Sequence, residues 1–168
     1  MAQLTMNRAV PQTLQQRLDL ADGIIVDMQM TPSTTIYQGA FVGFVPGAGG
    51  TTGTIHPLVA SDSFAGIALA KVVSASTGVY TCPVYICGYF THAITSLAIT
   101  DVGKVVFADV LNTSSDNVLA LTSTATYPAV GRVANFVSTG IGIVHMKTPG
   151  SRAGASAQAT LSYIALVG

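Results

Sequence analysis

The sequence predicts an all-β protein, built as a single β-barrel or sandwich of many short antiparallel strands. β-branched and aromatic residues dominate a series of short apolar runs, and clusters of Gly, Pro, Ser, Thr and Asn separate these runs. A chain of 168 residues suits one domain with a sizeable core, since domains are commonly about 100–150 residues long. We expect an N-terminal arm over residues 1–22 and the β-domain over residues 23–168.

The predicted strands follow one another with short connections, as in barrels and sandwiches. Ser138-Thr139-Gly140 predicts a tight hairpin, and residues 112–117 predict a polar turn between two strands. In chain order, the predicted strands cover residues 23–30, 35–44, 54–60, 64–73, 79–90, 104–110, 117–122, 130–137, 140–147 and 160–167.

Helix is expected at two places only. Residues 12–23 follow Pro11, place Leu14 and Leu18 on one face and end at a glycine. Farther along, Thr100 is expected to cap a single helical turn that Gly103 ends. Residues 1–22 are more polar than the rest of the chain, which favours an arm outside the barrel that a partner holds in place.

Composition excludes several classes of function. Only 8% of the residues are charged, against about 25% in ordinary soluble proteins, and the net charge is zero. Such a chain offers no basic field for a nucleic acid. Its apolar runs are shorter than the roughly 20 residues of a membrane-spanning helix, and its N-terminus has no apolar signal region. We therefore expect synthesis in the cytoplasm and neither a nucleic acid nor a membrane as a partner.

The surface is predicted to be covered by other protein. A net charge of zero and a mean hydropathy of +0.56 favour association. Residues 105–108 and 141–146 are apolar at both odd and even positions, which fits strands with a core on one face and a neighbour on the other. These patterns predict a homo-oligomer.

No motif predicts catalysis, a small-molecule substrate, a cofactor or a metal. PGAGGTTG (46–53) lacks the lysine of a phosphate-binding P-loop and is interpreted as a flexible hairpin tip. His56, His92 and His145 lack the spacing of metal ligands, although a fold can bring distant histidines together. There is no Gly-x-Ser-x-Gly motif, and each aspartate suits a turn or a cap.

The two cysteines, Cys82 and Cys87, are an odd number of residues apart. In a strand they would point to opposite faces, so we expect no disulfide between them. Two cysteines are also too few for a four-ligand zinc site. Both are predicted to be small buried side chains in a reducing compartment.

A Val-Gly-cation-Val motif occurs twice, at residues 102–105 and 130–133. Glycine permits a bulge or an unusual φ where a strand begins, the cation would project at the rim of the sheet, and valine would pack inward. Two similar strand starts in one barrel suffice to explain the pattern. The residues assigned to these structural turns are Asp101, Gly103, Lys104, Gly131 and Arg132.

Several short motifs follow one another along residues 62–133 in an order that a known family shares. DSFAGIA (62–68) looks like a D-x-F-x-G-x-A strand, and a hairpin ending Gly-Tyr-Phe (88–90) follows it. Then come TDVGKVVFA (100–108), LALT (119–122) after a polar turn, and VGRV (130–133). This order resembles the head decoration, or capsid cement, proteins of tailed bacteriophages, over about residues 62–146. The family often has a proline after the lysine, where this chain has Val105.

The resemblance implies a non-enzymatic β-barrel, expected to be a trimer, that docks on the outside of an expanded phage shell and reinforces the joints between capsomers. Its partner would be the major capsid protein and its location the virion. We expect the arm to contact the capsid through Arg8 and Arg17, which can meet carboxylates, and through Leu14 and Leu18, which can enter an apolar groove.

Two other interpretations stay open. Another virion component, such as a tail or fibre subunit, would share this composition and strand content. A small oligomeric β-barrel enzyme or sugar-binding module is the other, and a sugar-binding module should expose clustered aromatic side chains. The candidates for such a cluster are Tyr80, Tyr85, Tyr89 and Tyr127.

Overall fold

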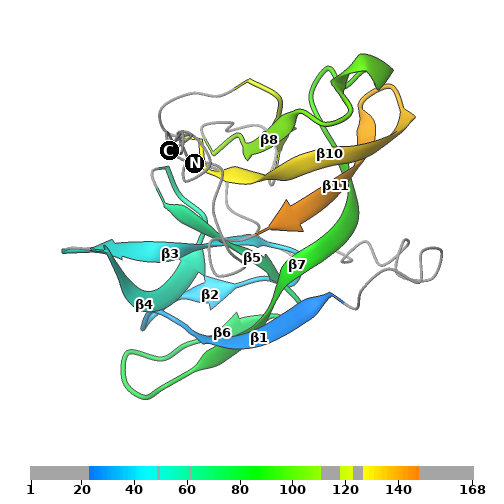
Figure 1. The fold of residues 1–168 in the computed structure, drawn as a ribbon. Helices are drawn as coiled ribbons and strands as arrows, with labels where there is room; N and C mark the ends of the chain where they lie inside the picture. The colour runs from blue at the N-terminus through cyan, green and yellow to red at the C-terminus, as the bar shows by residue number, and fades with distance from the viewer. Residues whose placement is uncertain (1–22, 49, 61, 111–117, 123–126, 148–168) are drawn as a thin grey trace, which may run out of the picture.

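A computed structural model, which describes residues 23–48, 50–60, 62–110, 118–122 and 127–147, confirms the all-β fold class. A curled antiparallel sheet forms a half-barrel (Figure 1). Its strands lie in the spatial order β4 (Gly50–Pro57), β3 (Phe41–Gly47), β5 (Ser63–Ala68), β7 (Thr81–Ala93), β11 (Ile141–Lys147), β10 (Ala129–Ser138), β8 (Val105–Ala108) and β9 (Leu119–Ala120). β1 (Ile24–Gln29) pairs with β7, while β2 (Thr35–Ile36) and β6 (Val72–Val73) form a separate two-stranded sheet.

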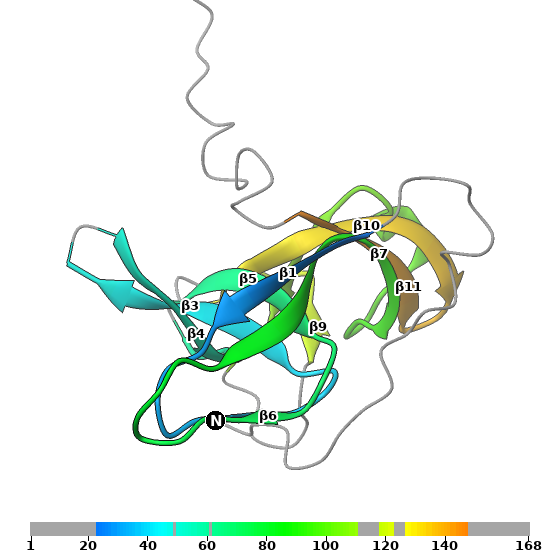
Figure 2. The ribbon, with the colours of Figure 1, turned by 90° about the horizontal axis from the view of Figure 1, so that it is seen from below.

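Strand β7 is long enough to serve three neighbours. Its 13 residues include Tyr85, which pairs with Ile25 of β1 and with Ile67 of β5. Because one residue can face two strands only across its two edges, β1 and β5 lie on opposite edges of β7. The C-terminal half of β7 pairs with β11. Figure 2 shows β1 alongside β7.

Two neighbouring strand predictions fail for one physical reason. The predicted strand 35–44 is divided into β2 and β3, and the predicted strand 64–73 is divided into β5 and β6. At both places the chain crosses from the large sheet to the small one. The crossings are hydrogen-bonded to each other: the Gly39 N–H donates to the Ala68 carbonyl (2.8 Å), and the Ala68 N–H donates to the Ala40 carbonyl (2.9 Å).

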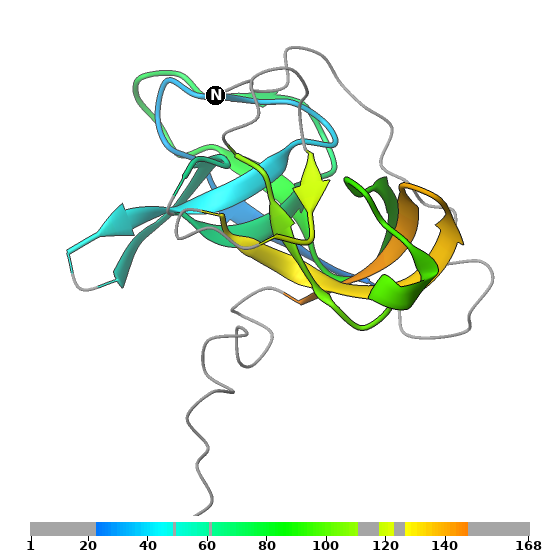
Figure 3. The same cartoon turned by 90° about the horizontal axis from the view of Figure 1, so that it is seen from above.

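The predicted hairpin tip at residues 46–53 consists mostly of strand. Pro46 pairs with Thr51 and Gly47 with Gly50, so β4 begins at residue 50 rather than 54. This hairpin extends away from the barrel (Figure 3). The other predicted hairpin is confirmed, since Ser138 pairs with Ile141 and Gly140 has a φ of 77°.

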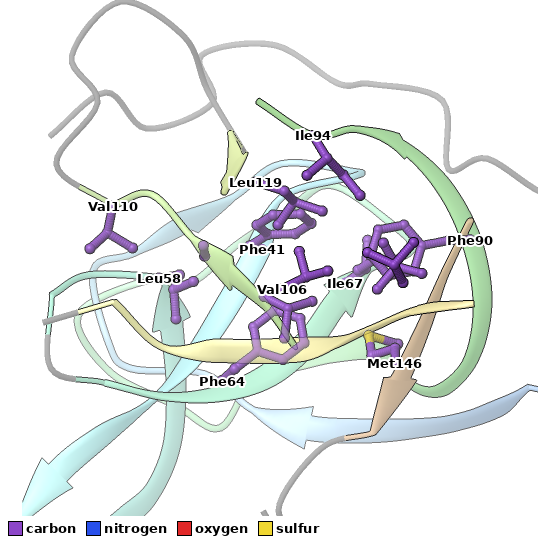
Figure 4. Packing of buried hydrophobic residues seen from close by; sticks show 14 of the residues in the cluster. Phe41, Leu58, Phe64, Ile67, Phe90, Ile94, Val106, Val110, Leu119 and Met146 are labelled. Carbon is purple, nitrogen blue, oxygen red and sulfur yellow. The ribbon is translucent and has the colours of Figure 1, made fainter. Parts of the chain in front are cut away.

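The main core fills the half-barrel (Figure 4). Phe64 and Phe90 are almost fully buried, and the Phe41 and Phe64 rings meet edge to face with centroids 5.7 Å apart. A second cluster, including Ile36, Ile55 and Val84, packs between the small sheet and the large one. Each such side chain stabilises the fold by about 1.5–3 kcal/mol when fully buried.

Three sequence predictions fall on residues outside those that the structure describes. They are the arm at 1–22 with its helix, the polar turn at 112–117 and the strand at 160–167. Of the predicted strand 117–122, the structure assigns Leu119 and Ala120 to a strand. In strand β11, Ile141 is exposed and His145 half-buried, whereas residues 142–144 and 146 are already buried within this chain; cover by a second subunit stays a prediction.

Candidate interaction surface

The two Val-Gly-cation-Val motifs are hydrogen-bonded to each other. Residues 102–105 and 130–133 meet where β8 and β10 pair antiparallel. The Gly103 N–H donates to the Val133 carbonyl (2.8 Å), and the Val133 N–H donates to the Lys104 carbonyl (2.9 Å). The repeat in the sequence is therefore one contact in the structure.

Gly103 is selected by its backbone conformation. Asp101–Lys104 forms a type II turn, in which the Lys104 N–H donates to the Asp101 carbonyl at 3.0 Å. Val102 has φ −56° and ψ 131°, and Gly103 has φ 91°. A Cβ at Gly103 would meet nothing within 4 Å, so the positive φ alone demands glycine here. Together with the two bonds to Val133, this geometry forms the glycine-first bulge that the sequence suggested.

Gly131 is selected by space instead. The φ of Gly131 is not positive, but a Cβ there would lie 2.2 Å from the carbonyl oxygen of His145 on β11. The pairing of β10 with β8 also shifts register between Ala129 and Gly131. The glycine of the motif is thus required for its backbone conformation in the first copy and for lack of space in the second.

Asp101 fixes the turn through its side chain. One carboxylate oxygen accepts the Ala98 N–H (2.7 Å), and the other accepts Lys104 Nζ (2.7 Å). Both bonds lower the pKa of Asp101 below its ordinary value, and the bond from Lys104 has the larger effect. The predicted cap is wrong in its position: Ala98, not Thr100, is the N-cap of the 3-10 helix η1 (Ile99–Asp101), because the Asp101 carboxylate bonds the Ala98 N–H.

The second cation also binds this turn. Arg132 Nη1 donates to the Gly103 carbonyl at 3.0 Å, so both cations of the motifs are held at one place on the surface. The Lys104 side chain remains 60% exposed. The structure therefore brings together the five residues that the sequence assigned to turns, Asp101, Gly103, Lys104, Gly131 and Arg132, but the assignment is wrong for Gly131 and Arg132, which lie within strand β10.

Exposed apolar side chains flank this turn and continue along the adjoining hairpin. Ile99 and Val102 project from η1 and the turn, and Val137 and Ile141 come from the β10–β11 hairpin; these four are 40–68% exposed. The Gly140 N–H donates to the Leu97 carbonyl (3.2 Å), which holds the hairpin beside η1 (Figure 3). We name this region the tip surface, made of Ile99, Val102, Lys104, Arg132, Val137 and Ile141.

A second exposed apolar region lies on β1. Ile24, Ile25 and Val26 follow one another and are 38–56% exposed. Ile24 pairs with Cys87 of β7, whereas Ile141 of the tip surface pairs with Ala93. Six residues of strand separate these positions, or about 20 Å along β7. The two regions are therefore distinct surfaces.

Sequence reasoning missed both apolar regions. Because turns are usually polar, the apolar residues Ile99 and Val102 near Asp101 could have indicated an exposed apolar surface at this turn. The residues expected to contact a capsid, Arg8, Leu14, Arg17 and Leu18, lie outside the described residues.

Asp62 stabilises the connection between β4 and β5. One of its oxygens accepts the Val59 N–H (2.7 Å) and lies 2.9 Å from His56 Nε2. Its other oxygen is buried without a hydrogen-bond partner. Desolvation raises the pKa of Asp62, although the bonds from Val59 and His56 oppose that shift. This pair fixes the turn that begins the D-x-F-x-G-x-A segment.

The described histidines and cysteines take part in separate contacts. His145 stacks on Tyr89 with centroids 4.5 Å apart, and His92 lies beside the Phe41 ring. No three His, Cys, Asp or Glu side chains gather as metal ligands within the described part of the chain. Cys82 and Cys87 are free thiols, the first buried and the second half-buried, and burial raises the pKa of Cys82 to about 11.

The four tyrosines considered for sugar binding are packed rather than exposed. Tyr85 is buried in the main core, and Tyr127 packs against that core. Tyr80 packs against the second cluster, and Tyr89 is half-buried beside His145. They do not form an exposed aromatic platform.

No known protein family, curated protein or solved structure matches this chain. The helical part of the described residues is too short to cross a membrane.

Proposed function

We propose that this chain is a structural virion protein that binds the outer surface of a bacteriophage capsid as a homo-oligomer, a trimer, and stabilises the joints between capsomers. The tip surface carries this proposal. It exposes Ile99 and Val102 beside two hydrogen-bonded cations, and Val137 and Ile141 on the adjoining hairpin, in a chain where only 8% of residues are charged. Its turn is built from the same residues that resemble the decoration-protein motif.

The tip surface suits a protein partner that offers a carboxylate to Arg132, because the charge of Lys104 is already paired with that of Asp101. Lys104 is tied to Asp101, and Arg132 is tied to the Gly103 carbonyl, so the positions of both charges are set before binding. These two side chains therefore lose little conformational freedom when a partner binds. The apolar side chains around the charges exclude water from the contact, which strengthens the interaction between opposite charges.

The homo-oligomer is supported by composition and by exposure elsewhere. The net charge is zero, and Val73 and Val79 are exposed beyond the tip surface. Association multiplies a modest capsid contact, because a second subunit binds at a high effective concentration once the first is bound. The arm, with Arg8, Leu14, Arg17 and Leu18, adds a further contact to the major capsid protein in this proposal.

A pelleting assay with expanded, undecorated capsids of the encoding virus tests the proposal. The double substitution Ile99→Asp and Val102→Asp places unpaired charges in the apolar contact, and we expect capsid affinity to fall by about tenfold or more. The matched control, Ser76→Asp and Thr77→Asp, adds the same charge at exposed positions in the loop between β6 and β7.

The control variant should pellet like the wild type, and sedimentation velocity should show an unchanged oligomer for both variants. If the tip variant binds shells like the wild type, the tip surface is not the contact. If the wild type itself does not pellet with shells, the proposed function is wrong.

A further inference from the structure

Strand β1 has an edge that is open toward Ile24. Within β1 the described pairing is with β7, on the edge of β7 opposite β5, while Met30, just after β1, bridges Ile55 of β4 and so limits the open part to the N-terminal residues of the strand. Its outward N–H and C=O groups can therefore accept another strand. Natural edge strands are commonly protected by charge, proline or a covering segment. Here Ile24, Ile25 and Val26 are exposed, and Asp27 is the one charged residue of β1.

We propose that residues 160–167 of the same chain pair with this open edge of β1. The segment TLSYIALV contains no charged residue, and its β-branched, aromatic and leucine residues predict a strand that needs cover on both faces. Exposed apolar side chains on β1 provide a matching surface. The added strand would cover the edge and extend the sheet.

The connection is long enough. Lys147, the last residue of β11, and Ile24, the first of β1, both pair with Cys87, so they lie on opposite edges of β7 at the same level. The outer side of β1 is then about 15 Å from β11, at about 5 Å per strand. Residues 148–159 can span up to about 40 Å when extended. Tethering also raises the effective concentration of the segment, which favours its own chain over a second copy.

The other open edges of the large sheet fit this segment less well. β4 is rich in Thr and Gly and ends in Pro57, and residues Met30 and Thr31 already bond to its Ile55. β9 has two residues, too few to template an eight-residue strand. Of the described edges, β1 alone combines sufficient length with exposed apolar side chains.

Hydrogen exchange followed by mass spectrometry tests this inference on the full chain. We expect the outward amides of β1, about half of those in Ile24–Gln29, to exchange at least about tenfold faster when residues 160–168 are deleted. Leu161→Lys with Ile164→Lys should have the same effect. Ser151→Lys with Ser156→Lys, which adds the same charge in the connection, should not. The β10–β11 hairpin serves as the internal reference.

Three results would overturn the inference. Equal exchange at β1 in the full and truncated chains would show that the segment does not cover it. Protection that disappears on dilution to the monomer would assign the edge to a second copy. Protection that arises only on bound capsids would assign it to the capsid. The inference does not depend on the proposed function, because exchange is measured on the free protein.

Discussion

At the scale of single residues, two glycines of one repeated motif do different work. Gly103 needs a positive φ but has open space, so alanine there should cost about 1–2 kcal/mol of unfolding free energy. Asparagine tolerates that φ and should cost less than alanine. At Gly131 the obstacle is the His145 carbonyl, so alanine and asparagine should both destabilise, by about 1–3 kcal/mol.

Urea denaturation of these four variants checks the prediction. Recovery by asparagine is expected at position 103 and not at position 131. A better tolerated asparagine at position 131 than at 103 would contradict the assignment of the two causes.

Two buried carboxylates should respond to pH in opposite directions. The lowered pKa of Asp101 stabilises the fold above the ordinary value of 3.8, and this contribution is lost as pH falls through the lowered pKa. The raised pKa of Asp62 has the reverse effect: its contribution is full below 3.8 and is lost as pH rises through the raised pKa.

Unfolding free energies of Asp101→Asn and Asp62→Asn, measured from about pH 5.5 to about pH 2.5, test these signs. The stability advantage of the wild type over Asp101→Asn should shrink on acidification. Its advantage over Asp62→Asn should grow. Parallel changes for the two variants would contradict the opposite pKa shifts.

At the scale of elements, local pattern predicts strands but not the sheet that each strand joins. Apolar runs located β1, β7, β10 and β11 within a few residues, because period and turn chemistry are local properties. The divisions within 35–44 and 64–73 depend on a second sheet whose partners are far apart in sequence. In the candidate site, the repeated motif could be recognised in the sequence. The pairing of its two copies, and the exposure of Ile99 and Val102, could not be predicted because they depend on neighbours that are distant in the sequence.

The main core makes a prediction at this scale. Phe90 on β7 is 1% exposed and contacts side chains from several strands, so Phe90→Ala should cost about 3–5 kcal/mol. Val79, just before β7, is 75% exposed, and Val79→Ala should change stability by less than about 0.5 kcal/mol. Thermal and urea unfolding measure both. Comparable losses for the two variants would contradict the assignment of the core.

At the scale of the whole molecule, the arm should be separable from the fold. The two core clusters form from residues between Met30 and Met146, so deletion of residues 1–20 should leave the protein folded and oligomeric. The same deletion should weaken capsid binding strongly, since every subunit of the oligomer loses a contact at once.

Light scattering on the truncated protein, beside a pelleting assay with undecorated capsids, checks both effects. Leu14→Asp with Leu18→Asp should reproduce most of the loss. Dissociation of the truncated protein into monomers would instead make the arm a strap between subunits. A truncated oligomer that coats capsids fully would contradict the predicted role of the arm.

A heat challenge of expanded capsids tests the central claim most directly. Undecorated shells are saturated with the purified chain, and their rupture temperature is measured by light scattering and electron microscopy. We predict that bound chain raises the rupture temperature and that the effect saturates with occupancy, because each added contact buries surface across a joint between capsomers. Shells that bind the chain but rupture at an unchanged temperature, or that bind none, would contradict the account.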